Sequence, residues 1–149
     1  MTRRLPTRRK TVRLHRAQAD FRRSSALYRG LVGGRGSGKT WVGAYDLIRR
    51  ARRGRLYLVA SPTYTVLSDT TFRTFCALAR ELGCMGERKV QPPVVMLTTG
   101  AEVIFRSADD PERLRGPNLS GAWLDEASQM HLDAYDIVLA ALRDQGEQG

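Results

Sequence analysis

The chain has 149 residues, of which 42% are hydrophobic and 7% aromatic, and its formal net charge is +10. This length is enough for one domain with a substantial core, but it is too short for two. No apolar run approaches the roughly 20 residues that a membrane-spanning helix needs, so we expect a soluble protein without a membrane partner. The composition is that of an ordinary α/β or α+β protein.

The positive charge is concentrated in the first third of the chain. Residues 1–55 hold 17 of the 25 Lys and Arg residues and only two acids, whereas residues 56–149 carry 8 basic and 13 acidic residues. Clustered arginines bind phosphate backbones by displacing counterions, which indicates a nucleic-acid partner. For the first residues, a solvated tail is an open alternative. An organellar transit peptide is another, although Pro6 and the scarcity of serine there speak against it.

The two cysteines and two histidines do not form a recognisable site. Cys76 and Cys84 lie eight positions apart without a C-x-x-C pair or a nearby histidine, so we expect reduced core thiols and a cytoplasmic setting. His15 and His131 are isolated in the sequence, and neither supports a catalytic or metal-binding role.

The first half of the chain predicts an arm, a strand and a helix. Residues 1–25 lack a sustained apolar period and are expected to form a basic arm, with a short helix over 13–23. The apolar run at 26–32 predicts a buried strand that ends at Gly33. A helix with a mostly apolar face is expected from 39 to 53.

The second half predicts an alternation of strands and helices. Its elements are, in order, a strand at 55–61, a helix at 67–82 closed by Gly83, a hairpin at 94–108 turning at Thr99-Gly100, an apolar strand ending before Asp125, and a helix at 132–143. Such an order favours an α/β sandwich with a mostly parallel sheet.

A phosphate-binding motif lies between the first predicted strand and the first predicted helix. Gly33, Gly38, Lys39 and Thr40 satisfy G-x-x-x-x-G-K-[ST] in the structural context that this motif requires. The glycines allow the backbone N–H groups to surround an anion at the start of the helix. Lys39 is then expected to reach the β- and γ-phosphates of ATP, and the Thr40 hydroxyl to bind Mg²⁺. The alternative is a flexible glycine turn with a surface lysine.

An acidic pair follows the strand in "GAWLDEA". Asp125 is the candidate metal carboxylate, and Glu126 beside it is the candidate general base for an attacking water. The alternative is a helix N-terminus with favourable acids. A glutamate directly after the metal carboxylate favours a motor-like ATPase over a small nucleotide kinase.

Three stretches together resemble a known family. "YRGLVGGRGSGKT", "SPTYTVLSDTTF" and "SADDPERLRGPNLSGAWLDEAS", in this order and spacing, resemble the N-terminal ATPase domain of tailed-phage terminase large subunits, the motors that drive viral DNA into a capsid. The resemblance covers about residues 15–145. It implies a three-layer P-loop NTPase fold of the ASCE type with a mostly parallel sheet, here over residues 26–149, and an Mg-dependent ATPase activity.

The resemblance also implies roles for particular residues. Asp125 and Glu126 correspond to the Walker B pair, and Gln18 resembles the glutamine that reads adenine, a solvent-exposed glutamine being the alternative. Arg115 matches the arginine presented to a neighbouring subunit's nucleotide, with Arg113 as its rival and a loop arginine without that role as the alternative. The Walker A loop comprises Gly33, Gly34, Arg35, Gly36, Ser37, Gly38, Lys39 and Thr40.

The chain departs from the family in two respects. The sequence contains no later strand with a Thr/Ser-rich coupling motif and no cluster of carboxylates typical of the family's nuclease domain. We therefore expect a partial ATPase domain, truncated after the Walker B strand and the following helix, with the nuclease domain absent. The resemblance does not imply that such a domain hydrolyses ATP alone.

The family further implies partners and a place of action. The partners are double-stranded DNA, the small terminase subunit, the portal protein and further copies of the chain in a ring. The place of action is the host cytoplasm, for a protein encoded by a phage or prophage. Two alternatives stay open: another nucleic-acid motor ATPase such as a helicase, and an inactive prophage remnant that only binds nucleotide or DNA.

Overall fold

A computed structural model describes residues 11–142 of the chain, which divides into two units, Met1–Val32 and Gly33–Gly149. Within the first unit, α1 (Arg16–Arg23) lies inside the helix predicted at 13–23. His15 caps it reciprocally with Gln18: the His15 N–H donates to Gln18 Oε1 at 3.2 Å, and the Gln18 N–H donates to His15 Nδ1 at 3.5 Å. This arrangement is a capping box. Positions 1–10 of the predicted arm lie outside the described residues.

The buried strand predicted at 26–32 was wrong. No strand is formed there, and Leu27, Tyr28 and Val32 are 86%, 60% and 98% exposed. An apolar run becomes a strand only where a neighbouring strand accepts and donates its backbone hydrogen bonds, and no strand in the described part of the chain pairs with this segment. Apolar character alone does not reveal whether such a neighbour exists.

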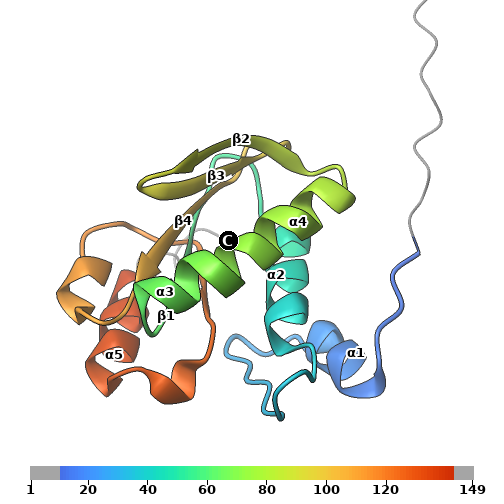
Figure 1. Ribbon diagram of the computed structural model, residues 1–149, viewed down its shortest axis with the longest axis horizontal. Coiled ribbons are helices and arrows are strands. Elements are labelled where there is room, and N and C mark those ends of the chain that lie inside the picture. Colours follow the sequence, from blue (N-terminus) through green and yellow to red (C-terminus); the bar gives the residue numbers. More distant parts are fainter. Residues whose placement is uncertain (1–10, 143–149) are drawn as a thin grey trace, which may run out of the picture. The chain divides into compact units, whose positions relative to one another are not determined.

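The second unit is built on a five-stranded sheet with the order β2-β3-β4-β1-β5. Figure 1 labels β1 to β4 of this sheet. β1 is parallel to β4 and to β5, whereas β3 is antiparallel to β2 and β4. The prediction of a mostly parallel sheet was therefore wrong: the sheet is mixed, because the short connections between β2, β3 and β4 permit only antiparallel pairing. The strands are β1 (Leu56–Ser61), β2 (Met85–Val90), β3 (Pro93–Leu97), β4 (Glu102–Ser107) and β5 (Gly121–Leu124).

Most of the strands agree with the sequence prediction. The hairpin predicted at 94–108 is confirmed as β3 and β4, and Gly100 in its turn has φ +88°. β2 was not predicted, because its sequence MGERKV has no apolar alternation and all of its residues after Met85 are exposed. As an edge strand it carries charged side chains, which discourage pairing with another chain.

The helices predicted at 39–53, 67–82 and 132–143 are confirmed with shifted ends. The structure has α2 (Lys39–Arg50), α3 (Tyr64–Val66), a π-helix η1 (Leu67–Phe72), α4 (Arg73–Glu81), α5 (Leu132–Ala141), and the short 3₁₀ helices η2 (Pro111–Leu114) and η3 (Ala127–Gln129). Gly83, at φ +70°, ends α4 as expected, and the Cys84 N–H donates to the Ala79 carbonyl at 2.8 Å. Position 143 of the predicted last helix lies outside the described residues. Among residues 11–142, no helix is both long and apolar enough to cross a membrane.

Helices pack on both faces of the sheet, which confirms three layers. Along β1, Tyr57 and Val59 face a cluster with α2 and α4, while Leu58 and Ala60 face a cluster with α5. Figure 1 shows α2 and α4 side by side and α5 apart from them. The buried thiol of Cys76 lies in the first cluster, and both cysteines are free. Burial raises the pKa of the Cys76 thiol.

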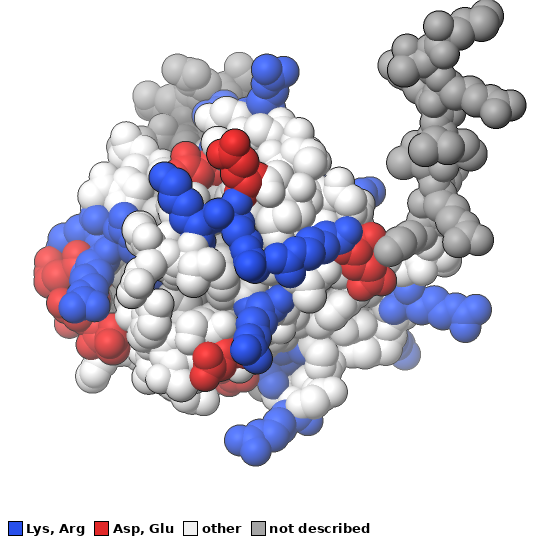
Figure 2. Space-filling view, turned by 45° about the horizontal axis from the view of Figure 1, so that its top comes forward, with Lys and Arg blue, Asp and Glu red and all other residues white. Residues whose placement is uncertain are grey.

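Basic side chains are distributed unevenly over the second unit. Figure 2 shows basic and acidic side chains interspersed on the face that it presents. A different arrangement is found from the last turn of α2 onward, where five arginines are exposed within seven positions and no acid stands among them: Arg49 and Arg50 in the helix, and Arg52, Arg53 and Arg55 after it.

The three parallel strands bring their carboxyl ends to one edge of the sheet. Ser61 at the end of β1 is in register with Ser107 at the end of β4. Asp125 follows β5 directly, and its N–H donates to the Ala60 carbonyl at 2.9 Å. In open α/β sheets, ligands bind at this edge.

Candidate functional site

The glycine loop before α2 has the backbone that its sequence predicts. Gly36 and Gly38 have φ values of +76° and +79°, which side chains with a Cβ adopt only with strain. At Gly33, an added Cβ would lie 2.7 Å from Ser37 Oγ, so a side chain there would force Ser37 to shift. The loop thereby turns tightly into the N-terminus of the 12-residue helix α2.

The side chain of Lys39 folds back over this loop. Its Nζ donates to the carbonyl oxygens of Gly33 at 2.7 Å and Gly34 at 2.9 Å. The ammonium group is therefore placed against the loop by two hydrogen bonds, beside the first turn of α2, where the helix dipole favours negative charge. Arg35 lies exposed in the same loop.

The structure brings together two predicted metal ligands that are 85 positions apart in the sequence. The Thr40 hydroxyl lies 3.0 Å from Asp125 Oδ1 and 3.2 Å from Oδ2. A second hydroxyl, that of Thr71, donates to Asp125 Oδ2 at 2.7 Å. Asp125 is only 3% exposed, so these hydroxyls replace the water that a carboxylate would otherwise bind.

Burial is the main influence on the Asp125 carboxylate. It raises the pKa of Asp125, the hydrogen bonds from Thr71 and Thr40 lower it, and the nearby charge of Glu126 raises it further; the net direction is upward. The charged form is thus disfavoured by its surroundings, and a cation next to it would reverse this effect.

Glu126 has an unusual backbone conformation. Its φ of 53° and ψ of 43° lie in the left-handed region, and it is the one non-glycine residue with positive φ in the described part of the chain. Such conformations cost about 1–3 kcal/mol and cluster at functional sites. The turn directs the chain from β5 into η3 immediately after Asp125.

α2 and β5 are held together by a close contact. An added Cβ at Gly43 would clash with the indole of Trp123, so the tryptophan of β5 packs directly on the backbone of α2. This contact lies two positions from Asp125 on one element and three from Thr40 on the other. It therefore fixes the distance between the two ends of the site.

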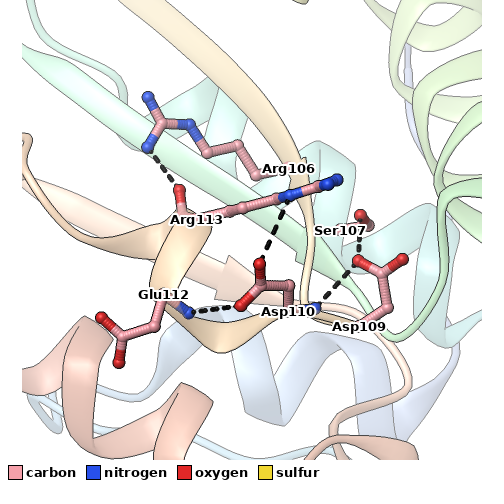
Figure 3. Close-up of polar contacts among 6 residues, drawn as sticks. All are labelled: Arg106, Ser107, Asp109, Asp110, Glu112 and Arg113. Atoms are coloured by element: carbon pink, nitrogen blue, oxygen red, sulfur yellow. Dashed lines mark hydrogen bonds and ion pairs between the residues drawn. The ribbon is translucent and has the colours of Figure 1, made fainter.

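The loop after β4 presents two arginines to solvent. Arg115 Nε lies 2.6 Å from Glu112 Oε2, and Arg113 Nε lies 3.6 Å from Asp110 Oδ2; the two arginine side chains are 60% and 68% exposed. Figure 3 shows Arg113 directed toward Asp110, and Arg106 directed toward the backbone carbonyl of Arg113, to which it donates at 2.7 Å. Both Arg113 and Arg115 are accessible to another molecule. The exposure of the two side chains therefore does not decide which arginine is presented to a neighbouring subunit.

Gln18, the residue matched to the adenine reader, lies in the first unit. It is 7% exposed, and its side-chain oxygen caps α1 through His15. The alternative of a solvent-exposed glutamine was wrong. The role of Gln18 toward adenine stays a prediction.

Two residues of the site were missed in the sequence. Ser61 and Thr71 are fully buried, and their hydroxyl oxygens lie 2.7 Å apart, beside Asp125. Both belong to the stretch "SPTYTVLSDTTF". Thr71 stands in the apolar stripe of the predicted helix at 67–82, and a hydroxyl on such a stripe is a signal that a buried polar partner faces it.

Comparison with known proteins identifies the family. Residues 31–147 match the family described as the terminase large subunit, T4likevirus-type, N-terminal. No curated protein matches the chain. The fold is similar to the large terminase ATPase domain of Thermus phage P74-26, with a TM-score of 0.65 and 22% identity over 89% of this chain and 61% of that one.

A second similar structure is the large terminase of a thermophilic bacteriophage in complex with ADP, with a TM-score of 0.64 and 17% identity over 76% of this chain and 30% of that one. The chain spans less than two thirds of the length of each of these two proteins. At these identities the structural likeness shows the fold, whereas the family match extends over most of the chain. The chain belongs to the family of T4-type terminase large subunits, in which it represents the N-terminal domain.

Proposed function

We propose that this chain is the ATP-binding part of a phage terminase motor, with a P-loop NTPase fold of the ASCE type. The observation that carries the proposal is the contact between Thr40 and Asp125, which joins the glycine loop to the acidic strand end. In P-loop NTPases these two positions hold the magnesium ion that accompanies the nucleotide.

The glycine loop is proposed to bind the phosphates. The backbone N–H groups of its residues, Gly33, Gly34, Arg35, Gly36, Ser37 and Gly38, form the phosphate cradle at the start of α2. Lys39 exchanges the carbonyls of Gly33 and Gly34 for phosphate oxygens, a short rearrangement for a flexible side chain.

The residues present fit a magnesium ion. Mg²⁺ prefers hard oxygen ligands and takes one or two carboxylates from the protein, the remainder coming from phosphates and water. The hydroxyl of Thr40 and the carboxylate of Asp125 are such ligands, and they converge. When bound, Mg²⁺ supplies neutralisation of the charge on the β- and γ-phosphates. The cation would stabilise the charged form of Asp125, which burial disfavours.

The remaining site residues are proposed to act on the attacking water, on the charge of the transferred phosphoryl group and on the adenine base. Glu126 is proposed as the general base that orients the water and accepts its proton. Arg115, with Arg113 as the alternative, is proposed to reach the nucleotide of a neighbouring copy, where a guanidinium stabilises charge on the transferred phosphoryl group. Gln18 is proposed to read the adenine base.

The whole motor is proposed to move double-stranded DNA into a capsid as a ring of copies, with the small terminase subunit and the portal protein, in the host cytoplasm. Membership of the terminase family supports this proposal. The exposed arginines after α2 supply the positive charge that a DNA partner requires.

Two substitutions test the assignment. Lys39→Ala is expected to weaken binding of a fluorescent ATP analogue to the full chain at least about 10-fold, because the site loses its cation and the charge-assisted hydrogen bonds that it donates. Lys89→Ala removes a lysine from the exposed strand β2 and serves as the matched control, with unchanged affinity. If both variants bind the analogue as the parent does, the phosphate site is not in this loop.

Glu126→Gln separates binding from chemistry. It keeps the size of the side chain and is expected to retain nucleotide affinity. In a colorimetric phosphate-release assay, its turnover is expected to fall about 10²- to 10⁴-fold below that of the parent chain, since the base is lost. A measurable turnover of the parent chain that the variant retains would exclude Glu126 as the base.

A further inference from the structure

Thr71 is a buried hydroxyl residue at the site to which the proposed function gives no task. It is fully buried in η1, its Oγ1 donates to Asp125 Oδ2 at 2.7 Å, and the same oxygen lies 2.7 Å from Ser61 Oγ. Ser61, at the end of β1, is fully buried as well. All three residues belong to the second unit.

The direction of these hydrogen bonds follows from the number of protons. An ionised carboxylate only accepts, and a threonine hydroxyl has a single proton to give. Thr71 therefore donates to Asp125, and Ser61 donates to Thr71. The Val66 carbonyl, at 3.5 Å, is a longer and weaker alternative acceptor for the Thr71 proton.

The backbone is irregular where Thr71 is presented. The six residues of η1 form a π-helix between α3 and α4, and the buried side chains of Leu67 and Phe72 stand at its two ends. π-helical turns are rare and occur frequently at functional sites. Here the wide turn presents a hydroxyl to Asp125 from a helix whose other buried residues are apolar.

The two oxygens of Asp125 have different surroundings. Oδ2 is held by Thr71 at 2.7 Å, whereas the closer contact of Thr40 is to Oδ1, at 3.0 Å. In the proposed function the Thr40 hydroxyl would bind the magnesium ion, and Thr71 would be the fixed partner of the carboxylate.

We propose that Thr71, supported by Ser61, is a positioning residue that holds Oδ2 of Asp125 and thereby directs Oδ1 toward the magnesium site. This inference rests on the proposed function, because it assigns Thr71 to the metal carboxylate of that site. Removing the hydrogen-bond partner of a metal ligand commonly lowers metal affinity 10- to 100-fold.

The test compares nucleotide affinity with and without magnesium. The quantity measured is the ratio of the Kd of a fluorescent non-hydrolysable ATP analogue in EDTA to its Kd in Mg²⁺, on the full chain. Thr71→Val keeps the shape but removes the hydroxyl, and this ratio is expected to fall about 10-fold, with the EDTA value unchanged. Thr71→Ser restores the hydroxyl and is expected to keep the parent ratio.

Thr70→Val is the matched control, because the neighbouring threonine is exposed and undergoes the same chemical change. Circular dichroism melts show whether each variant is folded. Should Thr71→Val fail to fold, Ser61→Ala replaces it, with an expected fall of about 3-fold since the hydroxyl of Thr71 loses its own donor.

The outcomes separate this inference from the proposed function. If Thr71→Val and Ser61→Ala keep the parent ratio, the positioning role is wrong while the site stands. If the ratio of the Kd values falls in Thr70→Val as well, the positioning role is also wrong, since the effect would not come from the buried hydroxyl. A parent chain whose analogue binding does not respond to Mg²⁺ would overturn both.

Discussion

The carboxylate of Asp125 is stabilised by two hydroxyl groups in a place that disfavours its charge. Hydrogen bonds to charged groups contribute about 1.5–3 kcal/mol each, and Thr40 and Thr71 supply two such donors. Burial nevertheless outweighs them, because the net direction of the Asp125 pKa is upward. The carboxylate is therefore expected to contribute little to stability, and cation binding is a role that its position next to the glycine loop explains.

Asp125→Asn tests this balance between stability and binding. The amide oxygen still accepts from a hydroxyl, while the cost of burying a charge disappears, so the thermal midpoint of the variant is expected to equal or exceed that of the parent. Its Mg²⁺-dependent gain in affinity for the ATP analogue is expected to fall about 10-fold or more. Differential scanning fluorimetry and the analogue titration measure the two quantities. A large drop in midpoint would show that the carboxylate serves stability instead.

Among the secondary-structure elements, α2 and β5 determine the geometry of the site. α2 begins at Lys39 and β5 ends at Leu124, so each carries one half of the site at its terminus. Trp123 packs against Gly43 on α2, where any Cβ would occupy the volume of the indole. A side chain at position 43 would therefore displace Trp123, which stands two positions before Asp125.

Gly43→Ala is expected to destabilise the chain although alanine is the better helix former. The gain in helix propensity is about 1 kcal/mol, whereas displacing a packed tryptophan costs about 1–3 kcal/mol. A lower thermal midpoint and weaker Mg²⁺-dependent analogue binding are expected together. Gly30→Ala, in open space and without a positive φ, is the control. A Gly43→Ala variant as stable as the parent would mean that Trp123 moves aside freely.

The elements that could be predicted from the sequence are those with a local signal. Apolar periodicity and Gly83 predicted α4, and Thr99-Gly100 predicted the turn between β3 and β4. β2 has no such signal, because its charged residues form a strand only through pairing with β3. The segment at 26–32 shows the opposite case, an apolar run without a pairing strand in the described part of the chain.

The same distinction holds for the site. Lys39, Thr40 and the acidic pair belong to contiguous motifs, so their residue types and spacing could be found in the sequence. Thr71 and Ser61 could not be assigned, because their role depends on a π-helical turn and on contacts across 54 and 10 positions. Tertiary packing, which no local pattern encodes, decides which buried hydroxyl meets Asp125.

The second unit separates the edge at which nucleotide binding is proposed from its most basic segment. The arginines after α2 precede Leu56 at the start of β1, whereas Ser61 ends the strand at the nucleotide edge. Six residues of strand span about 20 Å. DNA bound at these arginines would therefore be held well away from ATP.

Substitution of two of these arginines tests whether they bind DNA. Arg50 is engaged by Asp46 at 2.9 Å, so Arg52 and Arg53 are the better choice. If both neutralise phosphates, Arg52→Ala with Arg53→Ala is expected to weaken double-stranded DNA binding and to reduce the slope of log Kd against log salt by about 2, since each contact contributes about 0.9. Fluorescence anisotropy at several salt concentrations gives this slope.

The matched control removes the same charge elsewhere. Arg88→Ala with Lys89→Ala takes two basic residues from β2, where Glu87 already offsets part of the field, and a smaller change of slope is expected. Affinity for the ATP analogue should stay at the parent value in both double variants, because neither pair lies at the nucleotide edge. Equal slopes for the two variants would mean that DNA is attracted by the net charge of +10 rather than by the arginines after α2.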